Sequence, residues 1–565
     1  MSTPATRPVT PTAARQPETP VDAPDPRRWW SLGVLAAGLS MIVLDGTIVG
    51  VALPTIMTDL RLDLTSAQWV NSIYAVVFAG LLLSSGRLGD RIGRRTTFAA
   101  GVTVFVAGSL LAAIATGATP LVLSRVVQGI GGALILPSTL STVNATFRGR
   151  DRAAAFGVWG AVMSGMAALG PLLGGWLTSS FSWRWIFWVN LPIGLLVLAA
   201  TLAWVPQTYG RAARRGVDVD GLLTSLIGFG LLVFGLIEGT SLGWWQPRAE
   251  LRLLGLTWPG TAPVSPVPVA LAVGAVFVGL FLRWEKHRER VQRDALLDLG
   301  IFGIPTFAWG NLTAMAVAVG EFALVLVLPL YLVNAVGLST LATGGVLAAM
   351  AVGAFLSGAS ARHLAARWGA PSVVLIGLAL EVAGVLALAL VTREQLAVAT
   401  LLVPLLAYGI GLGLASAQLT STVLGDLPAE LSGQGSATQS TVRQLGAALG
   451  SAIGGTALAS GLSAQLPEQL QTVRGLPAQQ ADRLATSTAD SAGGVIAGLR
   501  GHETLGPLTR PVVDALATGM AHATSIALLT AAVALLLGLL GAVQVRRAAG
   551  RRLPSSTQSD SATSS

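Results

Sequence analysis

The stretch Gly86-Arg-Leu-Gly-Asp-Arg-Ile-Gly-Arg-Arg95 carries four arginines and one aspartate between two apolar runs, each long enough to cross a bilayer. So short a connection cannot leave the membrane surface, so its arginines must lie among the lipid headgroups. Positive charge in short connections is found on the cytoplasmic side. The stretch therefore predicts a multi-pass membrane protein and assigns this connection to the cytoplasm.

The composition of the 565-residue chain supports an integral membrane protein. Only 11% of the residues are charged and the mean hydropathy is +0.68, which is too apolar for a soluble domain of this size. The chain has no cysteine, which excludes disulfides, and its four scattered histidines argue against a metal site. Because most basic residues flank apolar runs, we expect membrane lipids, and no nucleic acid, to be the partner of the net charge of +9.

Apolar runs recur along the chain, each near the ~20 residues that a helix needs to cross hydrocarbon. They predict an all-α membrane protein with fourteen transmembrane helices. We place these spans at 31–55, 67–86, 97–116, 119–141, 153–178, 185–205, 219–239, 266–282, 306–333, 340–361, 371–391, 396–417, 434–460 and 522–545.

The distribution of charge predicts the orientation. With these spans, 25 basic residues fall on the side of the Gly86–Arg95 stretch, nine on the other side and two within spans. The positive-inside rule therefore places both termini in the cytoplasm. Residues 1–30 and 546–565 are predicted to be disordered cytoplasmic tails, and 461–521 a long extracellular loop that forms a small cap.

An internal repeat predicts two halves. Asp90-Arg91-Ile92-Gly93 follows the second span, and Ala366-Arg367-Trp368-Gly369 follows the tenth, without the acid. We therefore expect an N-terminal six-helix bundle over 31–205 and a C-terminal one over 306–545. The linker 206–305 then adds two transmembrane helices, and the site of such duplicated transporters lies between the repeats.

Several further motifs accompany the Gly86–Arg95 stretch in the first half. They are Leu44-Asp45-x-Thr47 with Ala52-Leu53-Pro54, Arg125-x-x-Gln128-Gly129-x-Gly131, Gly170-Pro171-x-x-Gly174-Gly175, and Trp183-Arg184-Trp185-x-Phe187 with Asn190-x-Pro192. In this order and with fourteen spans, they resemble the fourteen-helix drug:H⁺ antiporter family of the major facilitator superfamily, the multidrug efflux type. Gly50 departs from the pattern, because the family usually has Asn at that place.

Several ionisable residues lie within predicted spans, where an ionised group is costly. Asp45, Glu321 and Glu381 are predicted to exchange protons or bind substrate, and Arg125 to tune these acids or hold waters. Alternatively, the acids are packing residues bonded to polar neighbours, and Arg125 locks the first six helices together. We expect Asp45 and Glu321 to act in proton coupling, Glu381 in recognition of cations, and Arg443 to anchor its helix at the surface.

The Gly86–Arg95 stretch is predicted to be a gating loop formed by Gly86, Asp90, Arg91, Gly93 and Arg94. Its glycines permit tight turns, Asp90 can accept hydrogen bonds, and the arginines can grip the other half of the molecule. The alternative is charge that only sets topology, which explains the arginines but not Asp90.

The fifth span carries Gly170, Pro171, Gly174 and Gly175. Proline removes a backbone hydrogen bond and kinks the helix, and glycine lets a neighbouring helix approach closely. In the resembled family this pattern marks antiporters.

The sequence indicates a secondary active transporter and not an enzyme, because it shows no phosphate-binding loop, paired histidine ligands or nucleophile with its base. We expect a monomeric antiporter, without a cofactor and driven by the proton motive force. It would export small amphipathic or cationic compounds, such as drugs or antibiotics, across a bacterial inner (plasma) membrane. The alternatives are an exporter of one endogenous metabolite or lipid, and a non-transporting membrane sensor or scaffold.

The orientation can be tested with reporter fusions. A reporter that is active only in the cytoplasm should be active when fused within residues 211–215 and inactive when fused within 461–521, because the charge count places these segments on opposite sides. Cytoplasmic activity from the 461–521 fusion would overturn the predicted topology.

Overall fold

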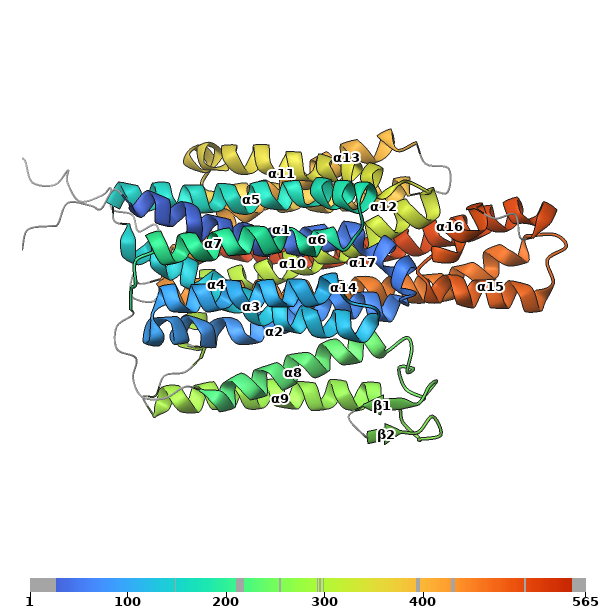
Figure 1. Cartoon of the computed structure of the whole chain (residues 1–565), viewed down its shortest axis with the longest axis horizontal. Helices are drawn as coiled ribbons and strands as arrows, with labels where there is room; N and C mark the ends of the chain where they lie inside the picture. Colours follow the sequence, from blue (N-terminus) through green and yellow to red (C-terminus); the bar gives the residue numbers. More distant parts are fainter. Residues whose placement is uncertain are drawn as a thin grey trace, which may run out of the picture.

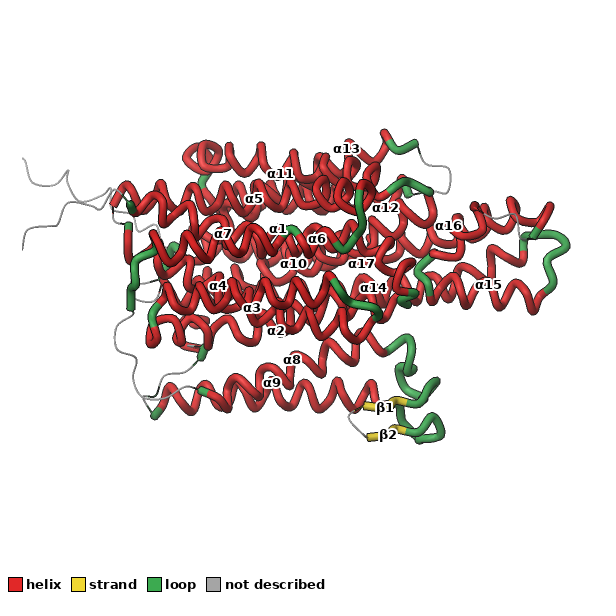
Figure 2. Tube along the Cα trace, in the orientation of Figure 1, coloured by secondary structure: helices red, strands yellow, loops and turns green. Residues whose placement is uncertain are grey.

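The computed structural model describes residues 27–147, 149–209, 218–253, 256–291, 293, 296–297, 299–392, 397–427, 432–501 and 505–550. Residues 1–26, 551–565 and the 211–215 segment lie outside the described residues. Long helices run side by side in one elongated bundle, with a single small pair of strands (Figures 1 and 2). The predicted all-α class is confirmed.

Three groups of elements follow one another along the chain. The first block contains α1 (Arg28–Leu60), α2 (Leu64–Ile92), α3 (Arg94–Ala113), α4 (Ala118–Thr146), α5 (Gly149–Ser180), α6 (Trp185–Trp188) and α7 (Asn190–Trp204). The inserted pair contains α8 (Val219–Glu238) and α9 (Pro266–Arg290), joined through the antiparallel strands β1 (Leu251–Leu253) and β2 (Leu256–Trp258).

The second block begins at the 3₁₀ turn η1 (Leu299–Gly303). It continues with α10 (Pro305–Leu330), the π-helical turn η2 (Tyr331–Val336), α11 (Thr340–Trp368), α12 (Ala370–Val391), α13 (Ala399–Leu424) and α14 (Ser432–Gln471). It closes with α15 (Ala478–Asp490), α16 (Gly494–Gly501), the 3₁₀ turn η4 (Gly506–Leu508) and α17 (Thr509–Gly550).

Twelve helices among the described residues are long and apolar enough to cross a membrane, or thirteen if the bent pair Leu64–Leu82 and Ser84–Ile92 is one span. The sequence predicts fourteen spans. The remaining predicted range, 153–178, falls on α5, which packs along α11 and whose side chains are described only in part.

The predicted gating loop is not a loop. α2 continues to Ile92 and α3 begins at Arg94, so only Gly93 separates the two helices. Gly93 has φ 103°, a conformation that favours glycine, whereas Gly86 lies within α2 and makes no turn. Gly369 separates α11 from α12 in the same way with φ 79°, so the repeat read from the sequence recurs in the backbone.

The two blocks share a core at one end of the bundle only. We call the end where α1 starts and α17 finishes the terminal end, and the end that carries α15 and α16 the cap end (Figure 1). At the cap end, one hydrophobic cluster joins residues of both blocks, for example Leu53 and Val70 with Leu330 and Leu458. At the terminal end, each block has its own cluster. The structure is therefore closed between the blocks at the cap end.

The seam between the blocks runs along two helix pairs, α5 with α11 and α2 with α14. The Thr55 and Thr340 hydroxyls meet across it at 3.0 Å, and Ser72 donates to the Ala448 carbonyl at 3.3 Å. Both contacts lie in the half of the bundle nearer the cap end, where the shared cluster lies.

The predicted extracellular loop 461–521 is largely helical. α14 extends to Gln471 and α17 begins at Thr509, so both helices project beyond the bundle and carry α15 and α16 (Figure 1). Arg500 donates to the carbonyls of Asn334 and Ala335, and Asn334 donates to the Ala492 carbonyl at 2.9 Å, which fixes this cap to η2. Burial, and then the charge of Asp63 in the first block, raise the pKa of Asp490.

The inserted pair lies against the seam. The Trp69 indole of α2 donates to Glu238 of α8 at 2.9 Å, and the Thr456 hydroxyl of α14 donates to the Leu236 carbonyl at 2.7 Å. A cluster of buried alanine, valine and isoleucine residues from α2, α8 and α14 fills the space between these bonds. The pair therefore contacts both blocks.

A cysteine pair tests the closed end. Because the natural chain has no cysteine, Thr55→Cys/Thr340→Cys introduces the only two thiols, placed where the hydroxyls meet. Mild oxidation of the purified protein should give an intramolecular disulfide, measured by peptide mass spectrometry. The control Thr103→Cys/Thr340→Cys should not cross-link, because the exposed Thr103 hydroxyl bonds to its own helix at Ala99. Failure of the Thr55 pair to cross-link would contradict the packed seam.

Candidate functional site: buried ionisable groups of the two blocks

Asp45 and Arg125 form an ion pair inside the first block. The guanidinium Nη1 of Arg125 lies 2.5 Å from Oδ2 of Asp45, and the side chains are 1% and 0% exposed, respectively. Arg125 also donates through Nε to the Val70 carbonyl at 3.1 Å, and its guanidinium lies 4.4 Å from the ring centre of Tyr74. Each buried charge thus has a compensating partner, as burial requires.

Gln128 extends this pair into a chain of polar contacts. It accepts from Arg125 at 2.7 Å and donates to Oδ1 of Asp45 at 3.0 Å and to the Ser109 hydroxyl at 2.8 Å. Asn190 donates to the same hydroxyl at 3.1 Å. The network joins side chains of α1, α3, α4 and α7 to the backbone of α2, so it fixes five helices of the first block to one another.

Glu321 and Arg443 form an ion pair in the second block, between α10 and α14. Nη2 of Arg443 lies 3.2 Å from Oε2 of Glu321, and the side chains are 43% and 16% exposed, respectively. Arg443 thus bonds an acid of the neighbouring helix, where the sequence predicts only an anchor at the membrane surface. This pair is longer and more open than the Asp45 pair.

Glu381 lies on α12 and is fully buried. Neither carboxyl oxygen has a hydrogen-bond partner among the described residues, and the same holds for the Tyr408 hydroxyl of α13. The charges of Glu321 and Arg443 both act on Glu381. An ionised carboxylate without donors is costly in such a place, so this environment suits the neutral acid.

The Gly-Pro motif of α5 lies at the seam. A side chain at Gly170 would meet the Thr47 hydroxyl at 1.8 Å, and one at Gly175 would meet the Thr340 carbonyl at 2.8 Å. Gly174 faces Ile48, and the Pro171 carbonyl lies against Gly344 of α11. α5 can therefore pack closely against α1 on one side and against the second block on the other.

The residues of the predicted gating loop contact their own block in this structure. Asp90 accepts from Arg94 at 2.8 and 3.0 Å, and Arg94 donates to the Ser141 carbonyl at 2.9 Å. The Arg94 amide bonds to Thr208, whereas Arg91 is exposed. The described contacts of Asp90 and Arg94 therefore tie the α2–α3 junction to α4 and to the segment after α7.

Some members of these groups were not predicted as site residues. Gln128 and Asn190 belong to motifs that the sequence shows, and the i, i+3 spacing of Arg125 and Gln128 places both on one helix face. Ser109 gives no such signal, because one serine in an apolar helix is common. Asp59 accepts from the side chains of Trp183 and Arg184, both at 2.8 Å. The Trp-Arg motif therefore binds the end of α1 to the segment before α6.

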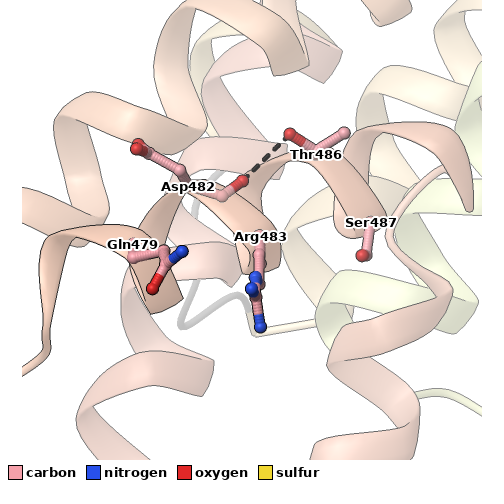
Figure 3. Close-up of a pocket in the computed structure, with 5 residues that line it drawn as sticks. All are labelled: Gln479, Asp482, Arg483, Thr486 and Ser487. Atoms are coloured by element: carbon pink, nitrogen blue, oxygen red, sulfur yellow. Dashed lines mark hydrogen bonds between the residues drawn. The ribbon is translucent and has the colours of Figure 1, made fainter.

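A hollow of about 410 Å³ lies on the cap, lined by Gln479, Asp482, Arg483, Thr486 and Ser487 (Figure 3). All five belong to α15, and the Thr486 hydroxyl bonds to the Asp482 carbonyl of the same helix at 2.9 Å. It is a face of one helix and not a site assembled from several elements, so we place the functional site at the buried acids.

Comparison with known proteins gives consistent matches. Residues 35–451 match the model of the Major Facilitator Superfamily. A puromycin resistance protein of Streptomyces alboniger is 34% identical over 451 residues, which are 77% of this chain and 84% of the relative. A tetracenomycin C resistance and export protein of Streptomyces glaucescens is 30% identical over 456 residues, 80% of each chain.

Among solved structures, a bacterial homologue of the human lysosomal transporter Spinster has a similar fold. It superposes with a TM-score of 0.59 at 17% identity, covering 93% of this chain and 99% of its own. The all-helical fold of this chain thus has a counterpart among membrane transporters.

The Asp45–Arg125 pair gives a prediction about stability. Asp45→Asn leaves the arginine buried without a counter-charge, so it should lower the free energy of unfolding by about 3 to 5 kcal/mol. Asp45→Asn/Arg125→Met removes both charges and should be less destabilised than the single variant. Thermal unfolding of the detergent-solubilised protein compares the two. Equal unfolding temperatures for wild type and Asp45→Asn would show that the pair does not hold the first block together.

Proposed function

The chain belongs to the Major Facilitator Superfamily of membrane transporters, and we propose that it exports small organic compounds, such as drugs or antibiotics, in exchange for protons. The observation that carries the direction of transport is the likeness to relatives named for resistance and export, over more than three quarters of the chain. These relatives are bacterial, which supports a plasma membrane location.

The acids divide into two kinds by their surroundings. Asp45 is the counter-charge of Arg125 in an apolar interior, so its loss would leave a buried and unpaired charge. Glu381 has the opposite environment, in which the protonated acid fits and the ionised one does not. We therefore assign the exchangeable proton to Glu381, expected from the sequence to recognise cations, and a structural role to Asp45, expected from the sequence to act in proton coupling.

Glu321 is the proposed binding site for a cationic substrate. Its carboxylate is partly exposed and its bond to Arg443 is long, so a cationic compound can replace the arginine there. Glu321 and Arg443 together carry no net charge, so a cation bound at Glu321 adds positive charge to this part of the second block and disfavours the proton on Glu381. Cation binding and proton binding then oppose each other, and such linkage is reciprocal. This is the requirement for antiport.

Alternation of access follows from the two ends of the bundle. We propose that the terminal end faces the cytoplasm and that this structure is the state closed on the outside, since the blocks share a core at the cap end. In the opposite state the blocks separate at the cap end and close at the terminal end. Asp90 and its arginines then come to face the second block and act as the gate.

The membrane potential can supply the free energy that this exchange needs. Each proton that moves inward down the membrane potential releases roughly 2.3 kcal/mol per 100 mV, before any pH gradient is added. No cofactor is needed for the proposed cycle.

Neutral variants of the two acids should separate their roles in proteoliposomes under an imposed pH gradient. Glu381→Gln should abolish proton release on addition of any substrate, because the proton site is lost. Glu321→Gln should reduce proton release strongly for a cationic substrate and little for a neutral one. Fluorescence of a trapped pH indicator gives the measurement.

Glu238→Gln is the matched control, because it neutralises an acid at the end of α8, away from both pairs. It should behave as wild type. Wild-type proton release by Glu381→Gln would refute the proposed proton site, and equal losses for both substrate types in Glu321→Gln would refute its role in cation recognition.

A further inference from the structure

The terminal end of α9 carries three cationic side chains and one histidine around one hollow. Arg283, Lys286, His287 and Arg290 line a hollow of about 330 Å³, and all four side chains are exposed. None of the ion pairs among the described residues uses one of them. The sequence predicts membrane lipids as partners of the basic residues in general, but it does not single out this place.

The acids of the same helix are engaged on its other side. Glu285 is buried and accepts from the Leu297 amide at 3.0 Å, and Glu289 accepts from the Leu299 amide. Arg288 is buried against Asp218 at 3.1 Å. The helix end is thereby divided: its carboxylates bond to protein backbone, and its exposed side is cationic.

The exposed face continues toward the cap end as an apolar stripe. Val269, Val273, Val276 and Leu280 are exposed, and Arg283, His287 and Arg290 follow at alternating steps of three and four residues, so all seven lie on one helix face. At 1.5 Å per residue, the apolar part is about 16 Å long. This length is close to half of the ~30 Å hydrocarbon core, which is the depth of one leaflet.

A ligand that fits this face has an anionic head of phosphate size and an apolar tail about one leaflet long. We propose that the terminal end of α9 is a binding site for an anionic phospholipid, with the phosphate among Arg283, Lys286, His287 and Arg290 and an acyl chain along the apolar stripe. Trp284 flanks the site. Its indole donates to Asp218 at 2.9 Å, and its ring centre lies 5.8 Å from that of His287. The inferred orientation of the chain places this site in the cytoplasmic leaflet.

A single reporter can test the site, because the chain has no cysteine. Leu280→Cys, labelled with a bimane fluorophore, lies on the stripe one turn before Arg283. The full-length protein is reconstituted in phosphatidylcholine vesicles that contain a fixed fraction of nitroxide-labelled phosphatidylglycerol or nitroxide-labelled phosphatidylcholine. We expect phosphatidylglycerol to quench the label more than phosphatidylcholine does at the same fraction.

Arg283→Gln/Arg290→Gln should lower this preference at least about fivefold, since one cation near an anionic lipid contributes about 1 kcal/mol, a factor of about five. The control Arg362→Gln/Arg367→Gln removes two exposed arginines from the terminal end of α11 and should leave the preference unchanged. Quenching by phosphatidylcholine reports that each variant is inserted, because it measures only contact of the stripe with lipid.

Three results would overturn the proposal. The first is equal quenching by the two lipids in the wild type, and the second is an unchanged preference in Arg283→Gln/Arg290→Gln. The third is loss of the preference on addition of millimolar inorganic phosphate, which would assign the hollow to a soluble phosphate ligand. Retention of the preference in phosphate, with its loss in the double variant, supports a lipid.

Discussion

A charge inside the hydrocarbon layer must find its counter-charge within the protein, and the first block is arranged around one such pair. Arg125 cannot lose its proton, so α4 must lie where Asp45 of α1 and the Val70 carbonyl of α2 can reach it. Gln128 accepts from the same guanidinium and donates to the second oxygen of Asp45, and it brings in α3 and α7 through Ser109. The relative positions of these five helices then follow from satisfying one guanidinium and one carboxylate. The block can move as a rigid body because breaking this network inside the membrane is costly.

The second block repeats the backbone of the first but not its electrostatics. The junctions at Gly93 and Gly369 have the same conformation, yet the acid that precedes the first, Asp90, is replaced by Ala366 in the second copy. Likewise, the first block contains a closed pair, whereas the second contains an open pair, Glu321–Arg443, and the buried Glu381, which has no hydrogen-bond partner among the described residues. One half therefore contains a closed and buried ion pair, and the other contains an open pair together with a buried acid that has no hydrogen-bond partner among the described residues. This asymmetry is the physical basis for placing exchange chemistry in the second block.

The sequence predicted the class of fold and singled out the repeat, Asp45, Glu321, Glu381 and Arg125, because each depends on a local or periodic signal. Apolar runs give spans, and an acid or arginine within a run is visible without knowledge of its neighbours. Partners were not predictable in this way. Arg443 and Glu321 are 122 positions apart, so no local sequence signal predicts their contact. The contact between Asp45 and Arg125 was unpredictable for the same reason.

The wrong prediction of a loop at Gly86–Arg95 has another cause. Glycine and charge indicate a turn, but α2 continues through Gly86 and ends only at Gly93, which has a positive φ. The helical cap was underestimated because α14 and α17 continue beyond their apolar runs.

The inserted pair shows which parts can move together. It contacts α2 along the length of that helix: Glu238 bonds to Trp69 near the cap end, Leu226 packs on Gly80 midway, and the charge of Arg87 acts on Glu285 at the terminal end. Its bond to the second block, from Thr456 to the Leu236 carbonyl, lies near the cap end, in the region where the blocks share a core. Separation of the blocks at that end would break this hydrogen bond and the apolar packing on α14, and would leave the contacts with α2 intact. The pair therefore belongs mechanically to the first block, and a ligand held on α9 acts on that block and not on the seam directly.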